Sequence, residues 1–257
     1  MREALAEAEQ RLAAAGVESP RVDAEWLVAH LLGTTRSGLA ACSGEVEGLE
    51  PLLARREARE PLAYVLGEWG FRRLTLRTDA RALVPRPETE TLVERALALV
   101  AEVEQPRILD VGVGSGAIAL ALKDERPDGR VTGVDISADA LSLARENADR
   151  LGLEVELRPG DGAVAAAEGW DLVVANPPYL EDLDGLQPEL RSEPEVALLG
   201  NGEHDRLARA ANARWLVMEV GDGQAPAVAE TLTSLGWQDV RITRDLTGTE
   251  RVVEGRR

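Results

Sequence analysis

The spacing of apolar residues changes character once along the chain. Up to about residue 66, apolar side chains recur every three or four positions, as at Leu5, Ala8 and Leu12, and Gly16 and Gly33 interrupt the pattern. This spacing places apolar groups on one face of a helix. Residues 1–67 are therefore predicted to form a small domain of helices that bury these faces against one another.

Beyond this domain the apolar spacing shortens to every second residue. Apolar and polar residues alternate around Arg72-Arg73, the apolar ones being Trp69, Phe71, Leu74 and Leu76. Such alternation is typical of a β-hairpin, so residues 68–84 are predicted to be a linker that carries one. A helix is expected from Glu88 to about Val103, with acidic residues in its first turn that favour the helix dipole.

From Arg107 onward, short apolar strands alternate with helical segments. The expected strands are 107–111, 131–135, 154–158, 171–175, 214–220, 237–243 and 249–254. This alternation is typical of a mainly parallel sheet with helices on both faces. Residues 85–257 are therefore predicted to be a doubly wound α/β domain with seven strands. Its last two strands would form a hairpin around Asp245 and Gly248 that adds an antiparallel edge strand.

A glycine-rich turn follows the first predicted strand of this sheet. The strand contains Asp110, and the turn is Gly112-Val113-Gly114-Ser115-Gly116. Glycines let a backbone turn sharply and approach a ligand closely. The third glycine comes two residues after the second, so the turn is not the dinucleotide fingerprint. The next strand ends in Asp135, 25 residues after Asp110, and its carboxylate suits two ribose hydroxyls. Together they predict a nucleoside site.

A second motif, Asn176-Pro177-Pro178-Tyr179, ends the strand predicted at 171–175. An amide or aromatic NH2 nitrogen is a poor nucleophile because its lone pair is delocalised, so a catalyst must hold the group by its N–H bonds. The Asn176 side-chain carbonyl and the Pro177 backbone carbonyl offer two acceptors, and the prolines stiffen the turn. Tyr179 can lie against the flat group. The motif therefore indicates methylation of a planar nitrogen by positioning.

The alternative for this motif is a plain strand exit, since Asn-Pro is a common turn dipeptide. The glycine turn and the spacing of Asp135 favour the functional interpretation, because these features occur together with Asn-Pro-Pro-Tyr in one chain. With them, the chain resembles class I S-adenosylmethionine-dependent methyltransferases of the amino-methylating kind. Two further segments, Arg59-Glu-Pro-Leu-Ala-Tyr-Val-Leu-Gly67 and Leu83-Val-Pro-Arg-Pro-Glu-Thr-Glu90, resemble the protein-(glutamine-N5) methyltransferases of peptide chain release factors, the PrmC/HemK family.

This resemblance covers essentially the whole chain, as far as Asp245-Leu-Thr-Gly-Thr-Glu-Arg251. It implies that S-adenosylmethionine is the cofactor, with the turn Gly112–Gly116 around its methionine end and Asp135 on its ribose. By the same resemblance Asp161 and Gly162 lie beside the adenine. Asn176 and the Pro177 carbonyl hold a glutamine amide in a slot shaped by Pro178 and Tyr179. Asn176 is also expected to contact the cofactor, and Asp110 belongs to the cofactor-binding strand.

Two residues and one segment depart from the family pattern. Val113 stands where a hydroxyl residue is expected, and Gly162 where a bulky residue often flanks the adenine, so that pocket is either more open or filled from elsewhere. The chain is also roughly ten residues short between Gly200 and Trp215. We expect a truncated helix there, which changes sheet packing more than chemistry.

The charge balance bears on the choice of partner. A formal net charge of −17 makes the protein a poor generic binder of phosphate backbones, so no direct nucleic-acid binding is expected. A local basic patch is still conceivable, either as a solvated rim or as a contact surface for a macromolecule; its members are Arg72, Arg73, Arg77, Arg81 and Arg86. With 44% hydrophobic residues, there is ample material for a core.

Other segments carry two interpretations each. The N-terminal helical domain either caps the sheet or grips the protein substrate, as the resemblance implies. The loop after Tyr179 either presents a solvated acidic face or binds a basic partner; its acids are Glu181, Asp182, Asp184, Glu189, Glu193 and Glu195.

Cysteine usage and termini indicate a cytoplasmic protein. The single cysteine, Cys42, suits a reducing compartment, and the acidic N-terminus is unlike a signal peptide. No apolar stretch approaches the length of a membrane span. His30 and His204 are the only histidines, so no zinc ligand set is expected. We expect a monomer.

The leading hypothesis is methyl transfer from S-adenosylmethionine to a glutamine amide in the Gly-Gly-Gln loop of a release factor. Methylation of a ribosomal-protein glutamine is a close alternative. Adenine-N6 methylation of nucleic acid is disfavoured by the acidic charge and by the segment Val84–Glu90. A non-catalytic, cofactor-binding partner of another subunit is a fourth possibility, and the intact Asn176-Pro-Pro-Tyr179 argues against it.

Overall fold

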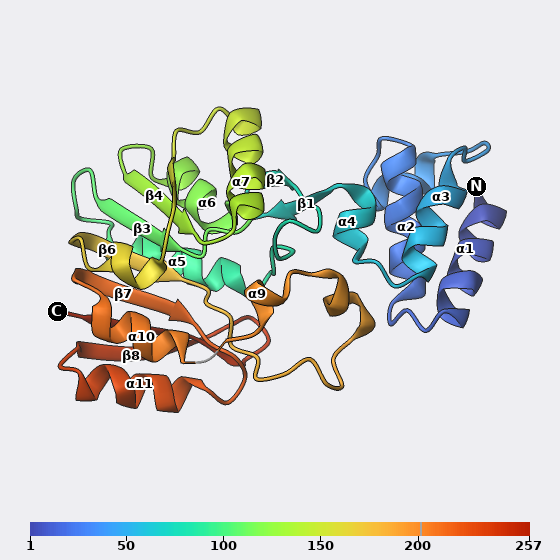
Figure 1. Cartoon of the computed structure of the whole chain (residues 1–257). Coiled ribbons are helices and arrows are strands. Elements are labelled where there is room, and N and C mark those ends of the chain that lie inside the picture. Colours follow the sequence, from blue (N-terminus) through green and yellow to red (C-terminus); the bar gives the residue numbers. More distant parts are fainter. Residues whose placement is uncertain (201) are drawn as a thin grey trace. The chain divides into compact units, whose positions relative to one another are not determined.

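The computed structural model describes residues 1–200 and 202–257, which fall into two compact units (Figure 1). The first unit comprises Met1–Glu68 and Gly185–Ser192, and the second comprises Trp69–Asp184 and Glu193–Arg257. The first unit is thus completed by a segment that lies more than a hundred residues further along the chain. No helix among the described residues is long and apolar enough to cross a membrane.

The first unit is helical, as its apolar spacing predicts. It contains α1 (Arg2–Ala14), α2 (Pro20–Leu31), a 3-10 helix η1 (Ser37–Ala41), α3 (Leu49–Glu57), α4 (Leu62–Leu66) and, from the later segment, η2 (Pro188–Ser192). The apolar face of α1 is buried at Leu5, Ala8 and Leu12. Helix α2 begins at Pro20, where the fixed φ and the missing N–H of proline cost nothing.

A buried arginine holds the later segment to these helices. Arg56 is 5% exposed; its Nε donates to Asp23 Oδ2 at 2.7 Å and its Nη2 to Glu189 Oε1 at 2.7 Å. Arg59 Nε donates to the same Glu189 oxygen at 2.7 Å. Burial alone would raise the pKa of Glu189, but the hydrogen bonds from Arg59 and Arg56 lower it to about 2. Glu189 is therefore an internal ion-pair partner, not part of a solvated acidic face.

The Glu189→Gln substitution should destabilise the first unit by about 3 kcal/mol, because it leaves Asp23 as the one acidic partner of the buried Arg56 and removes the acidic partner of Arg59. The expected measurement is urea unfolding of the full chain at pH 7. Glu195→Gln is the matched control, since Glu195 is an exposed acid of the same loop. The depressed pKa means that the contribution of Glu189 is present at neutral pH and is lost as the pH falls toward 2. A Glu189→Gln chain as stable as the control would contradict this role.

The second unit is built on a seven-stranded sheet. Its strands are β3 (Arg107–Val111), β4 (Arg130–Asp135), β5 (Glu156–Pro159), β6 (Trp170–Ala175), β7 (Ala213–Glu219), β8 (Gln238–Arg244) and β9 (Glu250–Arg256). The spatial order is β5-β4-β3-β6-β7-β9-β8, and β3 to β7 are parallel. The chain reverses its direction of travel across the sheet between β3 and β6. In open α/β sheets such a switch point leaves a crevice at the carboxyl ends of the strands.

The antiparallel strand is not at the edge. The hairpin of β8 and β9 forms as predicted, but β9 lies between β7 and β8 and pairs antiparallel with both. The predicted position of the antiparallel strand is therefore wrong. Helix α11 (Ala225–Ser234) carries the chain past one strand position before β8. The turn after Asp245, whose Oδ1 accepts from the N–H groups of Thr247 and Thr249, brings β9 back into that gap.

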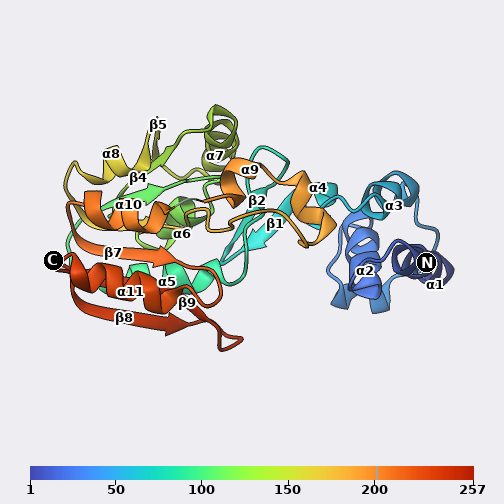
Figure 2. The same cartoon turned by 60° about the horizontal axis from the view of Figure 1, so that its bottom comes forward.

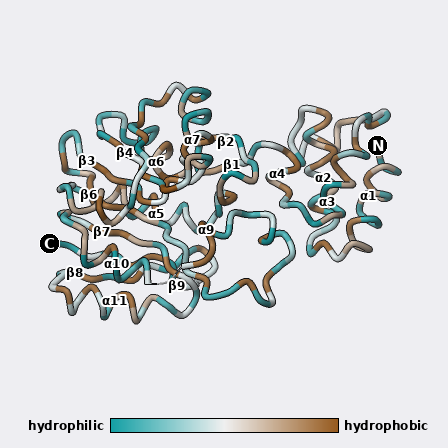
Figure 3. Tube along the Cα trace, viewed as in Figure 1, coloured by the Kyte–Doolittle hydropathy of each residue, from teal (hydrophilic) through white to brown (hydrophobic). Residues whose placement is uncertain are grey.

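Residues along the central strands alternate between the two faces of the sheet, as the period of a strand requires. Ile108 packs on the face that carries α5 (Thr89–Leu99), α6 (Ala117–Glu125) and α7 (Ala138–Leu151). Leu109 packs on the face that carries α8 (Gly162–Ala166), α10 (Glu203–Ala210) and α11. Figure 2 shows α10 and α11 in front of the sheet, and Figure 3 shows hydrophobic residues along its central strands. The doubly wound α/β fold is thus confirmed.

The hairpin and the helix that follows it complete this unit. Strands β1 (Glu68–Phe71) and β2 (Leu74–Arg77) pair with each other, and Phe71 and Leu76 are buried in the core of the first face. Helix α5 ends at Leu99, four residues earlier than expected. The guanidinium of Arg126 donates to the carbonyls of Val100 and Ala101, which satisfies the chain where the helix stops.

Candidate active site

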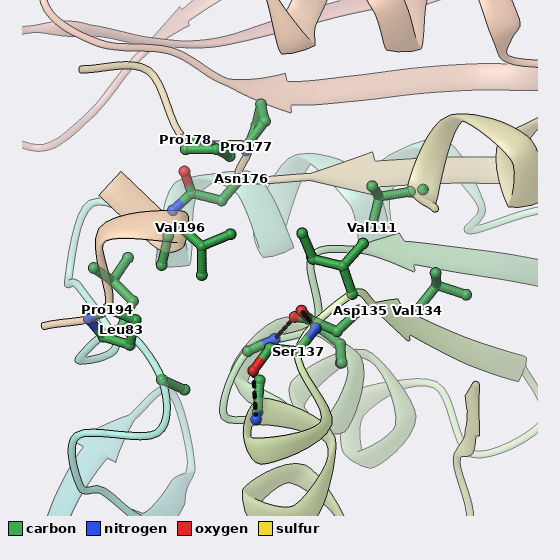
Figure 4. Close-up of a pocket in the computed structure, with 18 of the residues that line it drawn as sticks. Leu83, Val111, Val134, Asp135, Ser137, Asn176, Pro177, Pro178, Pro194 and Val196 are labelled. Carbon is green, nitrogen blue, oxygen red and sulfur yellow. Dashed lines mark hydrogen bonds between the residues drawn. The ribbon is translucent and has the colours of Figure 1, made fainter. Parts of the chain in front are cut away.

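A cavity of about 270 Å³ lies at the carboxyl ends of β3, β4 and β6, the edge at which the chain reverses its direction (Figure 4). Most of the predicted site residues line it, because they lie at or just after the carboxyl ends of these three strands or, for Asp161 and Gly162, of the neighbouring β5. The lining comes from residues 81–86, Thr89, 111–115, Ala117, Ile118, 134–137, Ala140, 160–163, 176–178, Pro194, Val196, Ala197, Leu199, Glu203, Arg206 and Leu207. The sheet therefore brings the glycine turn, Asp135 and Asn176 to one cavity.

The glycine turn needs its glycines. Gly112, Gly114 and Gly116 have φ values of 74°, 54° and 88°, in the left-handed region that other residues avoid. The Gly114 N–H donates to Asp135 Oδ2 at 2.9 Å, and the Ser137 N–H donates to Asp135 Oδ1 at 2.9 Å. The carboxylate of Asp135 thus ties the turn to the start of α7. A carboxylate has further lone pairs for a hydroxyl donor.

The side chains of the turn point into the protein. Val113 is 3% exposed, and a Cβ at Gly133 of β4 would lie 2.6 Å from Val113 Cγ2. The valine thus takes the space that this glycine leaves, which accounts for an apolar residue where a hydroxyl was expected. Ser115 is also buried, and its backbone carbonyl accepts from Asn147 Nδ2 at 2.9 Å.

Asp110 lies beneath the turn and does not line the cavity. It is fully buried; Oδ2 accepts from the Ala119 N–H at 3.0 Å, and Oδ1 has no hydrogen-bond partner among the described residues. Burial raises the pKa of Asp110 to about 7, the hydrogen bond from Ala119 opposes the rise, and the charge of Asp135 adds to it. The structure thus places Asp110 as an anchor for the first turn of α6.

Asp110→Asn should flatten the dependence of stability on pH. The raised pKa means that the wild-type chain loses stability as the pH rises from the usual aspartate value toward 7, by about 2 kcal/mol between pH 5 and pH 7. Asparagine cannot ionise, so the variant lacks this loss. The measurement is the free energy of unfolding in urea at both pH values, with Asp139→Asn, an exposed aspartate of α7, as control. Parallel pH curves for wild type and Asp110→Asn would contradict the assignment.

The wall expected beside the adenine is formed differently from the family pattern. A Cβ at Gly162 would lie 2.1 Å from Val111 Cγ1, so no side chain fits there and Val111 occupies the space. Asp161 Oδ1 accepts from the Ala163 N–H at 2.9 Å and caps α8, and Oδ2 pairs with Arg206. Helix α10 was expected to affect packing more than chemistry, yet its Arg206 lines the cavity.

Gly162→Ala should cost about 1 to 3 kcal/mol of stability, because the added methyl group overlaps Val111. Adding Val111→Ala in the same chain should recover part of that loss, since the smaller residue makes room. The two substitutions form a double-mutant cycle that urea unfolding can measure. Strictly additive effects would mean that the two side chains do not compete for this space.

The Asn-Pro-Pro-Tyr motif is divided between two cavities. Asn176 follows β6 directly, and Asn176, Pro177 and Pro178 line the first cavity. Tyr179 instead lines a neighbouring hollow of about 740 Å³. A Cβ at Gly221 would lie 2.9 Å from Tyr179 Cδ2, so the ring packs against this backbone. Burial raises the pKa of the Tyr179 hydroxyl. Pro178 lines both cavities, so it lies between Asn176 and Pro177 on one side and Tyr179 on the other.

Residues from two further segments complete the first cavity, and sequence reasoning assigned none of them to it. One is the segment 81–86, and the other contributes Pro194 and Val196, at and just inside the start of the short helix α9 (Glu195–Leu198). Glu193 joins the segments: it is 4% exposed, its Oε2 accepts from the Val84 N–H at 3.0 Å, and its Oε1 pairs with Arg86. Glu193 is thus not part of an acidic surface. In the sequence, Pro85 and Pro87, which stiffen the chain in and just after the segment 81–86, were the feature that could have indicated its role in the cavity.

The five arginines of the suspected basic patch all have acidic partners. They form ion pairs as follows: Arg72 with Glu125, Arg73 with Asp124, Arg77 and Arg81 with Asp79 and Glu146, and Arg86 with Glu193. Their charge is therefore largely neutralised locally. This arrangement supports the solvated rim over a surface for phosphates.

The cavity fits S-adenosylmethionine. The glycines with positive φ let the backbone approach the charged amino acid end of the cofactor. The Asp135 carboxylate lines the cavity and suits the hydroxyl groups of a ribose. Ile136 exposes 67% of its surface and forms an apolar wall. Together the doubly wound sheet, this cavity and Asn176-Pro-Pro-Tyr179 define a class I S-adenosylmethionine-dependent methyltransferase of the amino-methylating kind.

Comparison with known proteins identifies the family. Residues 3–67 match the PrmC N-terminal domain, and residues 89–202 match the methyltransferase small domain. A release factor glutamine methyltransferase of Deinococcus radiodurans is 42% identical, over 100% of this chain and 98% of the relative. One from Rhodospirillum rubrum is 42% identical, over 96% and 82%. The chain belongs to the release factor glutamine methyltransferase family.

A more distant likeness concerns the fold alone. The hMettl16 catalytic domain, solved in complex with the MAT2A 3'UTR hairpin 1, is 16% identical, with a TM-score of 0.60 and 80% of each chain covered. It shares the methyltransferase architecture with the chain.

Proposed function

We propose that this protein transfers a methyl group from S-adenosylmethionine to the N5 amide nitrogen of a glutamine in the Gly-Gly-Gln loop of peptide chain release factors. Membership of the release factor glutamine methyltransferase family supports the activity and the substrate. The observation that carries the chemistry is the position of Asn176 and Pro177 on the wall of the cavity that fits the cofactor.

The proposed mechanism relies on positioning. S-adenosylmethionine supplies an electrophilic methyl group. The Asn176 side-chain carbonyl and the Pro177 backbone carbonyl accept hydrogen bonds from the two N–H groups of the glutamine amide. This arrangement turns the nitrogen lone pair toward the cavity. Fixed acceptors of this kind lower the barrier by orientation and need no strong base. Pro178 shapes the slot, and Tyr179 supports the turn from the neighbouring hollow.

Most of the residues that we propose to bind the cofactor line this same cavity. The backbone of Gly112–Gly116 would hold the methionine end, and the Asp135 carboxylate the ribose. Val111 and Ile136 would flank the adenine, beside Gly162 and the Asp161–Arg206 pair. Asp110 would support the turn from below without touching the ligand.

The helical domain of residues 1–67 would grip the release factor. In this proposal the enzyme acts as a cytoplasmic monomer without direct nucleic-acid contact. Methylation of a ribosomal-protein glutamine is the second candidate, because Asn176 and Pro177 would hold any primary amide. Adenine methylation is less well supported, since the basic rim is occupied by ion pairs.

The test is methyl transfer from labelled S-adenosylmethionine to purified release factor. Wild-type enzyme should label the factor, and a factor with its loop glutamine changed to alanine should stay unlabelled. Asn176→Ala should reduce kcat by about 100-fold or more, because a preorganised acceptor is lost. Asn212→Ala, an exposed asparagine outside the cavity, is the matched control. Label on a ribosomal protein or RNA, with none on the factor, would overturn the proposed substrate.

A further inference from the structure

Two buried polar residues stand directly behind Asn176. Thr89 is the first residue of α5 and is 4% exposed; Glu219 is the last residue of β7 and is 2% exposed. Strands β6 and β7 are parallel, with Ala175 opposite Met218. The next residue of each strand is therefore Asn176 on one and Glu219 on the other, so the register itself brings the carboxyl to the amide.

The contacts around Asn176 give its amide a direction. Asn176 Nδ2 donates to Thr89 Oγ1 at 3.2 Å. The carboxyl of Glu219 is buried near both: burial raises its pKa to about 7, and the neighbouring polar groups of Thr89 and Asn176 offset part of that rise. An asparagine side chain has two N–H donors on one side and a carbonyl on the other. With its nitrogen turned toward Thr89 and Glu219, its carbonyl oxygen is left for a ligand.

Burial of the Glu219 carboxyl reduces the stability of the fold. Oε2 has no hydrogen-bond partner among the described residues, and a buried polar atom without a partner destabilises a fold. The charged groups near it are Arg251 and Glu88, and its backbone carbonyl contacts His204 Nε2 at 2.7 Å. An apolar residue would fill this place without that cost. The position of the carboxyl next to a catalytic amide therefore calls for a functional explanation.

We propose that Thr89 and Glu219 are positioning residues that fix the orientation of the Asn176 amide, so that its carbonyl oxygen faces the substrate nitrogen. The inference rests on the proposed function. Without these two acceptors the amide can rotate by half a turn and present its NH2 group. A donor would then meet the N–H of the substrate, and the hydrogen bond that aims the lone pair would be lost.

The first test compares two substitutions of Thr89. Thr89→Val keeps the shape and removes the hydroxyl, so kcat should fall by about tenfold or more, as one misdirected hydrogen bond implies. Thr89→Ser keeps the hydroxyl and should stay within about twofold of wild type. Because Thr89 lines the cavity, the Kd for S-adenosylmethionine is measured by calorimetry for both variants; it should change far less than kcat, because the cofactor does not need the amide direction. Thr89→Val with wild-type kcat would overturn the proposal, and so would Thr89→Ser as slow as Thr89→Val.

A second measurement is independent of turnover. The chain has four asparagines, so the side-chain NH2 signal of Asn176 in asparagine-labelled protein can be assigned by its loss in Asn176→Asp. Its hydrogen exchange should be slow in wild type and Thr89→Ser, and faster in Thr89→Val and in Glu219→Gln, which weakens the acceptor. Equal exchange in all four would refute the positioning role. An inactive wild-type enzyme whose Asn176 signal still shows the expected pattern would refute only the proposed function.

Discussion

The parallel register of β4, β3 and β6 is the constraint on which the active site depends. Val111 pairs with Val134 on one side and with Ala175 on the other. Because neighbouring strands lie about 5 Å apart, the next residues along these strands, Gly112, Asp135 and Asn176, must lie side by side along one edge of the sheet. Nucleoside-binding and amide-binding groups are thus assembled by backbone hydrogen bonds that involve none of the reactive side chains.

This register also explains which features could be predicted from the sequence. Strand periodicity, the glycine turn and the Asn-Pro-Pro-Tyr turn are local patterns, so each indicates its own element and the edge it belongs to. The insertion of β9 between β7 and β8 depends on which strands pair across the sheet, and the alternation within each strand does not specify its neighbours. The attachment of Gly185–Ser192 to the helical unit depends on the ion pairs of Glu189 with Arg56 and Arg59. Such contacts between distant residues leave no local pattern.

Charge was the hardest property to interpret from the sequence. Residues that cluster along the chain, such as the acids after Tyr179 or the arginines of the hairpin, suggest a surface of one sign. In the structure Glu189 and Glu193 are internal partners, and the hairpin arginines pair with acids of α6, α7 and the segment around Asp79. Long arginine side chains reach acids that are far away in the sequence. The sign of a cluster along the chain therefore says little about the electrostatic potential at the surface that a binding partner contacts.

The departures from the family pattern are related to one another by shape. Val113 fills the space left by Gly133, and Val111 fills the space left by Gly162. Both valines flank Gly112, so the start of the turn is held from each side by a close apolar contact. In this chain an apolar contact of Val113 stands where a hydroxyl hydrogen bond was expected, and Val111 occupies the space beside Gly162 where a bulky residue was expected. Because close-packed interiors tolerate little change in volume, a side chain larger than glycine at Gly133 or Gly162 would displace the valine that packs against it and, with that valine, the backbone beside Gly112.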